Sequence, residues 1–330
     1  MFLFTIFTLL SSCTLKPLSR GNGGELVVVA DEEDRPVIRK LLESTFGIQV
    51  KTPQSEALFR IIWIEATDLE FYTRSPLILI ANSIDATNET SSLVNKMLSV
   101  DVRNGVNNQD YAVFKLQDPW ARGQLLLLLL GKSKADLGDN AVYWADSLLN
   151  WSLIFEHDRL SRKVSTISSI ETYNTEFKGV GFSFLKPPDY ITAQENDSLN
   201  FVRYIRHYPE RWFMIRWGKI ESNDSFDAEY VYIKRSECND AFLDPVDTYA
   251  DNWSWKFENF NNYDAIKVRG LWAAEGPSGG GPFFSYGIVI PEKGVWFLLD
   301  GAVLAPGESK MPYLWQLEAI AHSFSIVLGE

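Results

Sequence analysis

The sequence predicts an α+β protein of two domains, each a sandwich-like arrangement of mixed helix and strand layers with mostly antiparallel sheets. Three observations support this prediction. Short β-branched and aromatic runs alternate with helical patterns in both halves of the chain. A polar stretch rich in Ser and Thr over 166–179 separates the halves. In the second half, a tight turn over 291–294 joins two long strand patterns, which is typical of antiparallel neighbours.

The first half opens with a β-branched strand pattern over 25–30. A helix follows, with Asp34 as its expected N-cap and Pro36 in its first turn. The run 124–130 is apolar without alternation, which predicts a strand buried on both faces. We expect the other elements to be strands over 59–65, 76–81 and 111–116, and helices over 35–43, 90–98 and 135–164.

The second half begins with a strand over 182–185 and a hairpin around Tyr208-Pro209-Glu210. An amphipathic apolar stripe predicts that a helix over 313–327 ends the chain. Between these elements we expect hairpin strands over 201–207 and 212–217, a helix over 227–243, and strands over 265–274, 283–290 and 295–304.

The chain starts with MFLFTIFTLLSSC, an apolar run that is too short to span a membrane as a helix. Its length matches the apolar region of a signal peptide. The order Leu-Ser-Ser-Cys13 resembles a bacterial lipobox, in which the cysteine thiol receives a diacylglycerol. The usual basic residues before the apolar run are missing. The alternative interpretation is a buried N-terminal strand with Cys13 in the core.

A Gly-rich stretch follows Cys13 and has the composition of a flexible tether. We therefore assign 1–12 to a signal peptide, 13–24 to a lipid anchor and tether, and 25–170 and 171–330 to two folded domains. Thr14, rather than Asp, follows the cysteine, and by resemblance to other lipoproteins this favours the periplasmic face of the outer membrane.

The composition excludes some partners. The net charge is −12 and no basic run interrupts it, so nucleic acid is not expected as a partner. The chain has 11 Trp, which supply apolar area for a core. Trp253 and Trp255 alternate, so both belong to one face of a strand. That face is either packed in the core or a platform for a sugar or another flat ligand.

Motifs for catalysis are weak. Gly131-Lys132-Ser133 resembles the tail of a phosphate-binding loop, but position 126 is Leu where that loop needs Gly. The three His are not at metal-ligand spacing, so we expect neither a metal nor a cofactor. Cys238 has no CxxC partner, which favours a buried, inert thiol over a nucleophile. A disulfide between Cys13 and Cys238 is formally possible.

One group of residues in the second half forms a candidate ligand or packing site. The stretch 276–282 is the richest in Gly, and between two strands it indicates a hairpin turn, a bulge or the wall of a cleft. Together with the nearby aromatic and basic residues, the candidates are Trp253, Trp255, Arg269, Trp272, Gly280, Gly281 and Pro282.

Several short segments resemble an uncharacterised lipoprotein family of Bacteroidetes, a domain of unknown function of the DUF 4837 type. They lie at 25–29, 52–59, 118–124, 269–272, 280–283, 300–306 and 317–323. The resemblance implies a lipid-anchoring cysteine and brings no activity, cofactor or catalytic residue. The element order of the second half also resembles a PsbP/Mog1-type sandwich, a fold that hosts binding and assembly factors.

These features predict a cell-envelope lipoprotein that acts as a non-enzymatic binding or assembly module for an envelope protein or a small molecule. Two alternatives stay open. An envelope hydrolase would assemble its site from distant residues, so that Asp or Glu and His converge in a deep pocket. A glycan-binding lipoprotein would expose the indoles of both Trp253 and Trp255.

Overall fold

The structure is a computed structural model that describes residues 16–177, 179–221, 226–242, 246–248, 253–274 and 279–328. The described chain divides into two compact units. The first comprises residues up to Gly21, Glu25–Leu41 and Ile61–Ala145, and the second comprises Asn22–Gly24, Leu42–Arg60 and everything from Asp146 on. No described helix is both long and apolar enough to cross a membrane. Cys13 lies outside the described residues.

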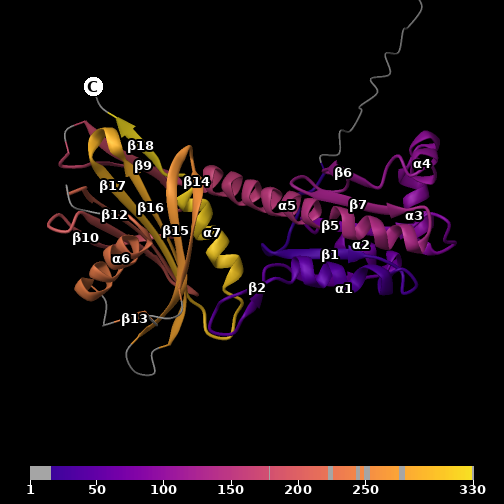
Figure 1. The fold of residues 1–330 in the computed structure, drawn as a ribbon, viewed down its shortest axis with the longest axis horizontal. Helices are drawn as coiled ribbons and strands as arrows, with labels where there is room; N and C mark the ends of the chain where they lie inside the picture. The colour runs from indigo at the N-terminus through magenta and orange to yellow at the C-terminus, as the bar shows by residue number, and fades with distance from the viewer. Residues whose placement is uncertain are drawn as a thin grey trace, which may run out of the picture. The chain divides into compact units, whose positions relative to one another are not determined.

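The first unit contains a five-stranded sheet in the order β4-β1-β5-β7-β6 (Figure 1). One face packs on the core residues Val94 and Val106 of the helices α3 and α4. The strands are β1 (Glu25–Val29), β4 (Arg60–Ile64), β5 (Leu77–Ser83), β6 (Val113–Gln117) and β7 (Leu125–Gly131). The helices are α1 (Arg35–Phe46), η1 (Ala66–Asp68), α2 (Leu69–Tyr72), α3 (Glu89–Met97), α4 (Val100–Asn107) and the start of α5 (Lys134–Ile167).

The predicted α+β class with mostly antiparallel sheets is confirmed for the chain as a whole, but two strand pairs in the first unit are parallel. Val27 pairs with Ile78 between β1 and β5, and Leu77 pairs with Leu125 between β5 and β7. Strand β6 runs antiparallel to β7. Every residue of β5 and β7 is buried, as expected for parallel strands covered on both faces.

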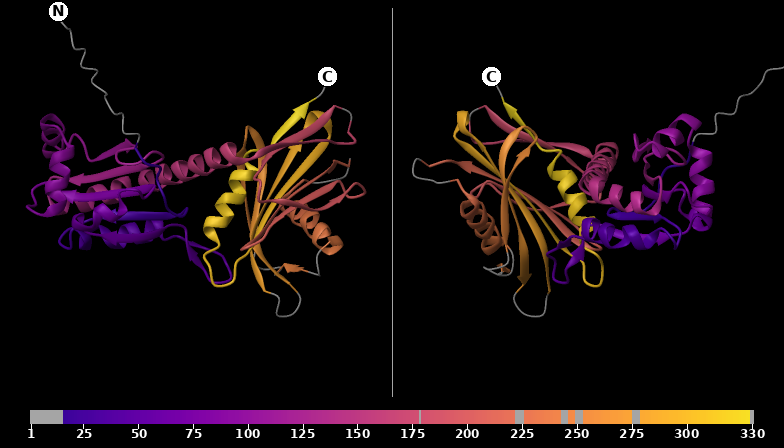
Figure 2. Two further views of the ribbon diagram at one scale, coloured as in Figure 1. Left: turned by 180° about the vertical axis from the view of Figure 1, so that it is seen from behind. Right: turned by 45° about the vertical axis from the view of Figure 1, so that its right-hand side comes forward.

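The second unit is built on an eight-stranded antiparallel sheet in the order β10-β11-β12-β17-β16-β15-β13, with β14 also paired to β15. Helices α6 and α7 lie on opposite sides of this sheet (Figure 2). A three-stranded sheet, β18-β9-β8, contributes Phe182 and Phe184, whose rings contact Phe297 and Phe213 of the large sheet. The elements are β8 (Ser169–Asn174), β9 (Val180–Lys186), β10 (Ile191–Asn196), β11 (Phe201–Arg206), β12 (Glu210–Lys219), α6 (Ala228–Phe242), β13 (Val246–Thr248), β14 (Ser254–Phe260), β15 (Tyr263–Ala274), β16 (Gly280–Ile290), η3 (Pro291–Lys293), β17 (Val295–Leu304), α7 (Met311–Ala321) and β18 (Ser325–Leu328).

The predicted C-terminal helix is wrong in its last third. Helix α7 ends at Ala321, and residues 325–328 form strand β18, which pairs with β9. Phe324 lies between α7 and β18, and it is buried against Phe182 rather than on a helical stripe. The β-branched pair Ile326-Val327 and the unsatisfied edge of β9 favour the strand.

The segment 42–60 belongs to the second unit, although the predicted first domain includes it. It carries the short strands β2 (Gln49–Val50) and β3 (Glu56–Ala57). The Glu56 carboxylate accepts hydrogen bonds from the backbone N–H groups of Lys310 and Met311, at 2.8 and 3.2 Å, where α7 begins. A carboxylate at a helix N-terminus satisfies donors that have no partner within the helix. This contact and the Phe59–Trp315 ring contact attach the segment to α7.

Candidate functional site

A cavity of about 500 Å³ lies within the second unit. One wall is apolar and comes from α5, α7 and the chain before β4, and the other is charged and comes from β14, β15 and α7. The size is typical of small-molecule sites. The lining residues are Leu58, Leu153, Ile154, His157, Leu160, Lys256, Glu258, Arg269, Trp315 and Glu318.

The charged wall is organised around Glu318 of α7. Its Oε1 accepts hydrogen bonds from the Lys267 ammonium, at 2.8 Å, and from the Arg269 guanidinium. Lys267 and Arg269 are two residues apart on β15, so both side chains lie on the face of the sheet that α7 covers. Glu258 of β14 contacts Lys267 at 3.6 Å and Lys256 at 2.6 Å. The Arg269 side chain remains 39% exposed.

The two carboxyl groups are held ionised. Burial alone would raise the pKa of Glu318, but the adjacent Arg269 and Lys267 outweigh it and hold that pKa well below the usual range. Burial likewise opposes ionisation of Glu258, and Lys267 and Lys256 lower its pKa. Burial also lowers the pKa of Lys267, and Glu318 opposes this shift.

Two histidines lie beside this network. The rings of His157 and His322 meet edge to face, with centroids 4.9 Å apart. His322 also stacks on Phe260, and its Nε2 lies 3.4 Å from the Tyr286 hydroxyl. Burial and the neighbouring His157 lower the pKa of His322 to about 4, so its imidazole is neutral at pH 7.

A second cavity, of about 320 Å³, shares Arg269 and Glu318 with the first. Three of the seven candidates from the sequence, Trp253, Arg269 and Pro282, line it. The remaining lining residues are Gln49, Val50, Lys51, Ser254, Gly270, Phe283, Phe284, Leu314 and Glu318. The ion pair between Arg269 and Glu318 is therefore common to the walls of both cavities.

The other candidates have different environments. Trp272 is buried in the core beneath α6, against Trp212. Trp253 is half-buried and stacks on Tyr232 of α6, whereas Trp255 is 50% exposed. Only one of the two indoles thus offers the open face that glycan binding requires.

Gly280 and Gly281 lie in strand β16, not in a ligand cradle. A Cβ atom at Gly281 would lie 1.8 Å from the carbonyl oxygen of Val303, and one at Gly280 would lie 2.4 Å from that of Trp272. These glycines permit neighbouring backbones to approach closely, as one of the sequence interpretations expects. Residues 275–278 of the Gly-rich stretch lie outside the described residues.

Cys238 is a free, buried cysteine in α6. Burial raises the pKa of its thiol to about 11, which keeps it protonated and unreactive at pH 7. The described part of the chain contains no group of three His, Cys, Asp or Glu residues arranged to hold a metal ion.

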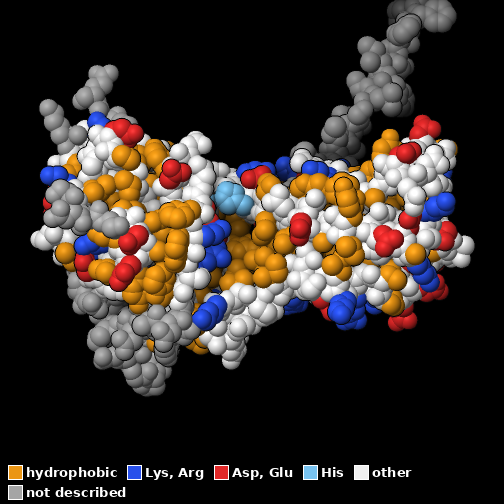
Figure 3. Space-filling model, in the orientation of Figure 1, with side chains coloured by type: hydrophobic (Ala, Val, Ile, Leu, Met, Phe, Trp, Pro, Cys, Tyr) orange, Lys and Arg blue, Asp and Glu red, His pale blue; other side chains and the backbone are white. Residues whose placement is uncertain are grey.

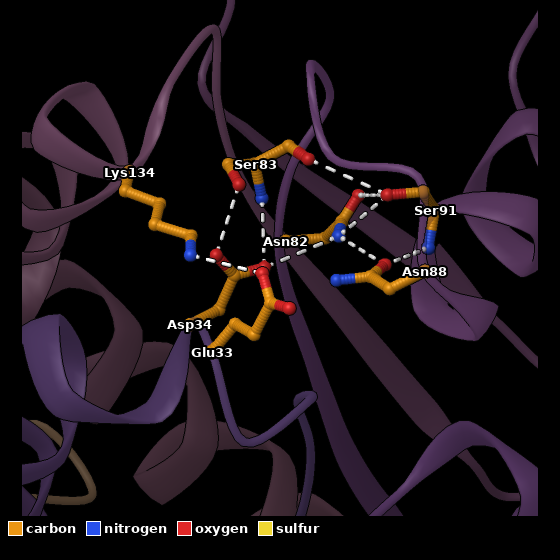
Figure 4. Close-up of polar contacts among 7 residues, drawn as sticks. All are labelled: Glu33, Asp34, Asn82, Ser83, Asn88, Ser91 and Lys134. Atoms are coloured by element: carbon orange, nitrogen blue, oxygen red, sulfur yellow. Dashed lines mark hydrogen bonds and ion pairs between the residues drawn. The ribbon is translucent and has the colours of Figure 1, made fainter.

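The first unit has a polar cluster at the carboxyl ends of β1 and β5, shown in Figure 4. The strand order places β4 on one side of β1 and β5 on the other, so this edge is where ligands bind in many open parallel sheets. Asp34, the expected N-cap of α1, instead accepts hydrogen bonds from the Ser83 hydroxyl at 2.9 Å and from the Asn82 amide at 3.3 Å. Asn82 also donates to Ser91.

Most polar groups of this cluster form hydrogen bonds within the cluster. Asp31 and Asn88 accept from the backbone N–H groups of Thr90 and Ser91, so the first turn of α3 is already capped. Lys134, after the Gly131-Lys132-Ser133 stretch, pairs with Glu33 at 3.0 Å. Asn82 and Ser83 are buried. The cluster therefore fixes the ends of β1 and β5, and the second unit offers the better candidate site.

Two family models together cover most of the chain. Residues 19–163 match a domain of unknown function, DUF8532, and residues 171–323 match another, DUF4837. The resemblance expected from the sequence is thereby confirmed for residues 171–323. The domain boundary predicted at residue 170 lies between the two matched segments, whereas the compact units divide within α5.

Solved structures show similarity over about half of the chain. The Saccharomyces cerevisiae Ran-binding protein Mog1p matches with a TM-score of 0.31 and 10% identity, over 48% of this chain and 95% of Mog1p. LpqN of Mycobacterium tuberculosis, described as involved in cell envelope biogenesis, matches with a TM-score of 0.33 and 14% identity, over 48% of this chain and 91% of LpqN. These similarities concern the fold alone. A search of curated proteins gave no match.

Proposed function

We propose that this protein is a lipoprotein of the bacterial cell envelope, tethered through Cys13, whose DUF4837 domain binds a small molecule in the 500 Å³ cavity. The lipobox-like order Leu-Ser-Ser-Cys13 and the Gly-rich tether support the anchor. The observation that carries the binding function is a cavity in which an apolar wall faces a preformed set of charged groups. We place the protein on the periplasmic face of the outer membrane, because Thr14 follows Cys13.

Binding is favoured over hydrolysis by the state of the charged groups. Glu258, Glu318 and His157 do converge on the cavity, as a hydrolase would require. Both carboxyl groups, however, are ionised and paired with cations, so neither can serve as the protonated general acid. The described lining residues of this cavity also include no Ser, Thr or Cys to act as a nucleophile.

The anchor is tested by the Cys13→Ala variant in the full-length chain. We expect the wild-type protein to sediment with membranes and the variant to be released into the soluble envelope fraction. Retention of the variant on membranes would contradict the lipid-anchor proposal. Metabolic labelling with a clickable fatty acid gives an independent readout, because only the wild-type protein should be labelled.

The cavity is tested by filling it. Ile154 lines the apolar wall, and Ile154→Trp adds volume there. We expect native mass spectrometry of the wild-type protein, incubated with a small-molecule extract of its own envelope, to show a bound mass that this variant does not retain. Ile170→Trp is the matched control, because Ile170 is exposed in the same unit and does not line the cavity. A ligand retained equally by all three proteins would refute the assignment of the site.

A further inference from the structure

We infer that the 500 Å³ cavity takes a single-chain amphiphile, with a hydrocarbon chain against the apolar wall and a head group of one negative charge at Arg269. This inference rests on the proposed function and names the chemical class of its ligand. It depends on three features of the cavity: the composition of the apolar wall, the balance of charges opposite it, and the exposure of Arg269.

The apolar wall is suited to a hydrocarbon chain. Leu153, His157 and Leu160 are spaced four and three residues apart, so they lie on one face of α5, and Ile154 lies beside them. Ile154 is 51% exposed, so part of its apolar surface is open to a ligand. Leu58 and Trp315 complete this wall. A hydrocarbon chain lying here would remove their apolar surface from water.

The charged network along and behind this wall carries an excess of one positive charge. Lys256 and Arg269 line the cavity and Lys267 is buried behind it, and these three cations pair with the two ionised carboxylates Glu258 and Glu318. The chain as a whole has a net charge of −12, so this local excess is a specific feature of the site. One negative charge on a ligand would neutralise it. A dianion would leave an uncompensated negative charge beside the carboxylates.

Arg269 is positioned to receive the head group. Its Nη2 donates to Glu318, and its side chain is 39% exposed where the walls of the two cavities meet. A guanidinium presents five donors in a planar fork, so it can hold Glu318 and still bind a carboxylate or a phosphate. Lys267, in contrast, is buried and already engaged by Tyr286 at 2.6 Å and by Glu318.

A sugar or a nucleotide suits the same cavity less well. Sugars need several hydrogen-bonding side chains around an open aromatic face. Here five of the ten lining residues are apolar, and the Trp315 ring already meets Phe59 edge to face. The charged lining groups pair with one another, so a polyphosphate would bring several uncompensated negative charges beside the carboxylates of Glu258 and Glu318.

The test is isothermal titration calorimetry of octanoate, decanoate and dodecanoate, below their micelle concentrations, into the full-length protein. Each added methylene group should tighten binding about fourfold until the cavity is full, which is about 15-fold per two-carbon step. Decanol, which lacks the charge, should bind at least about tenfold more weakly than decanoate. Equal affinity along the series, or equal affinity for decanol and decanoate, would overturn the inference.

Variants locate the two ends of the ligand. Arg269→Gln should weaken decanoate about tenfold or more and leave decanol unchanged, and Arg269→Lys should restore part of the loss. Ile154→Gln should weaken both compounds, whereas the matched control Ile170→Gln should weaken neither. If decanoate binds both Arg269→Gln and Ile154→Gln as tightly as the wild type, the head group does not lie at Arg269 and the hydrocarbon chain does not lie on the apolar wall. Circular dichroism of each variant shows whether it is folded.

A parallel titration with decanoyl lysophosphatidylglycerol distinguishes the source of the anionic head. Tighter binding of this lipid than of decanoate assigns the site to a membrane phospholipid, and the reverse assigns it to a free fatty acid. If no member of either series binds, while an envelope compound displaced by Ile154→Trp does, the amphiphile is excluded and the proposed binding function stands. If nothing binds in any of these experiments, both fail.

Discussion

A buried ion pair between Arg235 and Asp300 attaches α6 to the large sheet of the second unit. The Asp300 carboxylate accepts hydrogen bonds from the Arg235 Nε at 2.7 Å and from the Ser285 hydroxyl at 2.6 Å. Both charged side chains are 1% exposed. The guanidinium also lies over the Phe283 ring, 3.7 Å from its centroid.

Removing one partner of this pair should be costly. In Asp300→Ala the Arg235 guanidinium keeps its charge in a dry environment and loses the carboxylate that it contacts, and Ser285 loses its acceptor. Breaking a buried pair in this way typically costs about 3–5 kcal/mol. The cost should be large here, because two nitrogens of Arg235 and one oxygen of Asp300 have no hydrogen-bond partner among the residues that the structure describes. We expect a loss of about 4 kcal/mol in the free energy of unfolding.

The double variant Arg235→Met/Asp300→Leu is the decisive comparison. Replacing both charges by apolar groups of similar volume should return stability to within about 1 kcal/mol of the wild type. Urea denaturation measures the three free energies, and hydrogen exchange of the β12, β16 and β17 amides localises the loss to this unit. A loss below about 1 kcal/mol in Asp300→Ala, or a double variant no more stable than the single one, would refute this reasoning.

Three further predictions follow from the same unit. The Cys238 thiol, with a pKa near 11, should react with iodoacetamide at pH 8 only after the protein is unfolded. The pKa of the His322 imidazole is lowered to about 4 in the folded protein, so the unfolded state binds this proton more tightly. The free energy of unfolding should therefore fall by about 3 kcal/mol as the pH drops from 7 to 4. Urea midpoints at both pH values check this: His322→Gln should lose the part of the dependence that His322 contributes and keep the smaller part from Glu318 and Glu258, while the exposed His207→Gln keeps the full dependence. Gly281→Ala should lower the melting temperature sharply, because its Cβ would overlap the Val303 carbonyl oxygen.

The sequence predicts strands well where local pattern and burial agree. The hairpin β11–β12 and the strands β15, β16 and β17 lie close to their predicted ranges, because each is a long run bounded by turn residues. Strands such as β10 (ITAQEN) and β8 (SIETYN) are not predicted. Their residues are mostly polar and exposed, so only pairing with a neighbouring strand identifies them.

The local sequence pattern does not predict whether two strands pair parallel or antiparallel. The apolar runs of β5 and β7 indicate burial on both faces, and this is typical of parallel strands. Whether two such runs lie parallel depends on the crossover between them. Here α3 and α4 return the chain before β6, and β6 then pairs antiparallel to β7. Both strands are therefore predicted from the sequence, whereas their parallel pairing is seen only in the structure.

The candidate site is predicted only in part, because its walls come from segments far apart in the chain. The sequence predicts Arg269 as a site residue, because it is a basic residue near several aromatic ones. Glu318 was also detectable in principle, since it interrupts the apolar stripe of α7 between Leu314 and Ala321. Such an acidic residue on a buried helix face requires a cationic partner. The position of Leu58 and of the α5 face beside Glu318 and Arg269 depends on tertiary packing, which local sequence does not specify.

Two arginine–carboxylate pairs in the second unit use the same chemistry for different purposes. Arg235–Asp300 is 1% exposed on both sides and lines neither of the two cavities, so its charges are closed to solvent and position α6. Arg269–Glu318 contributes to the walls of two cavities, and Arg269 is 39% exposed. A guanidinium that is fixed by one carboxylate and open on its other side is already desolvated in part and oriented. That preorganisation lowers the cost of binding an anion, and it distinguishes a recognition group from a structural one.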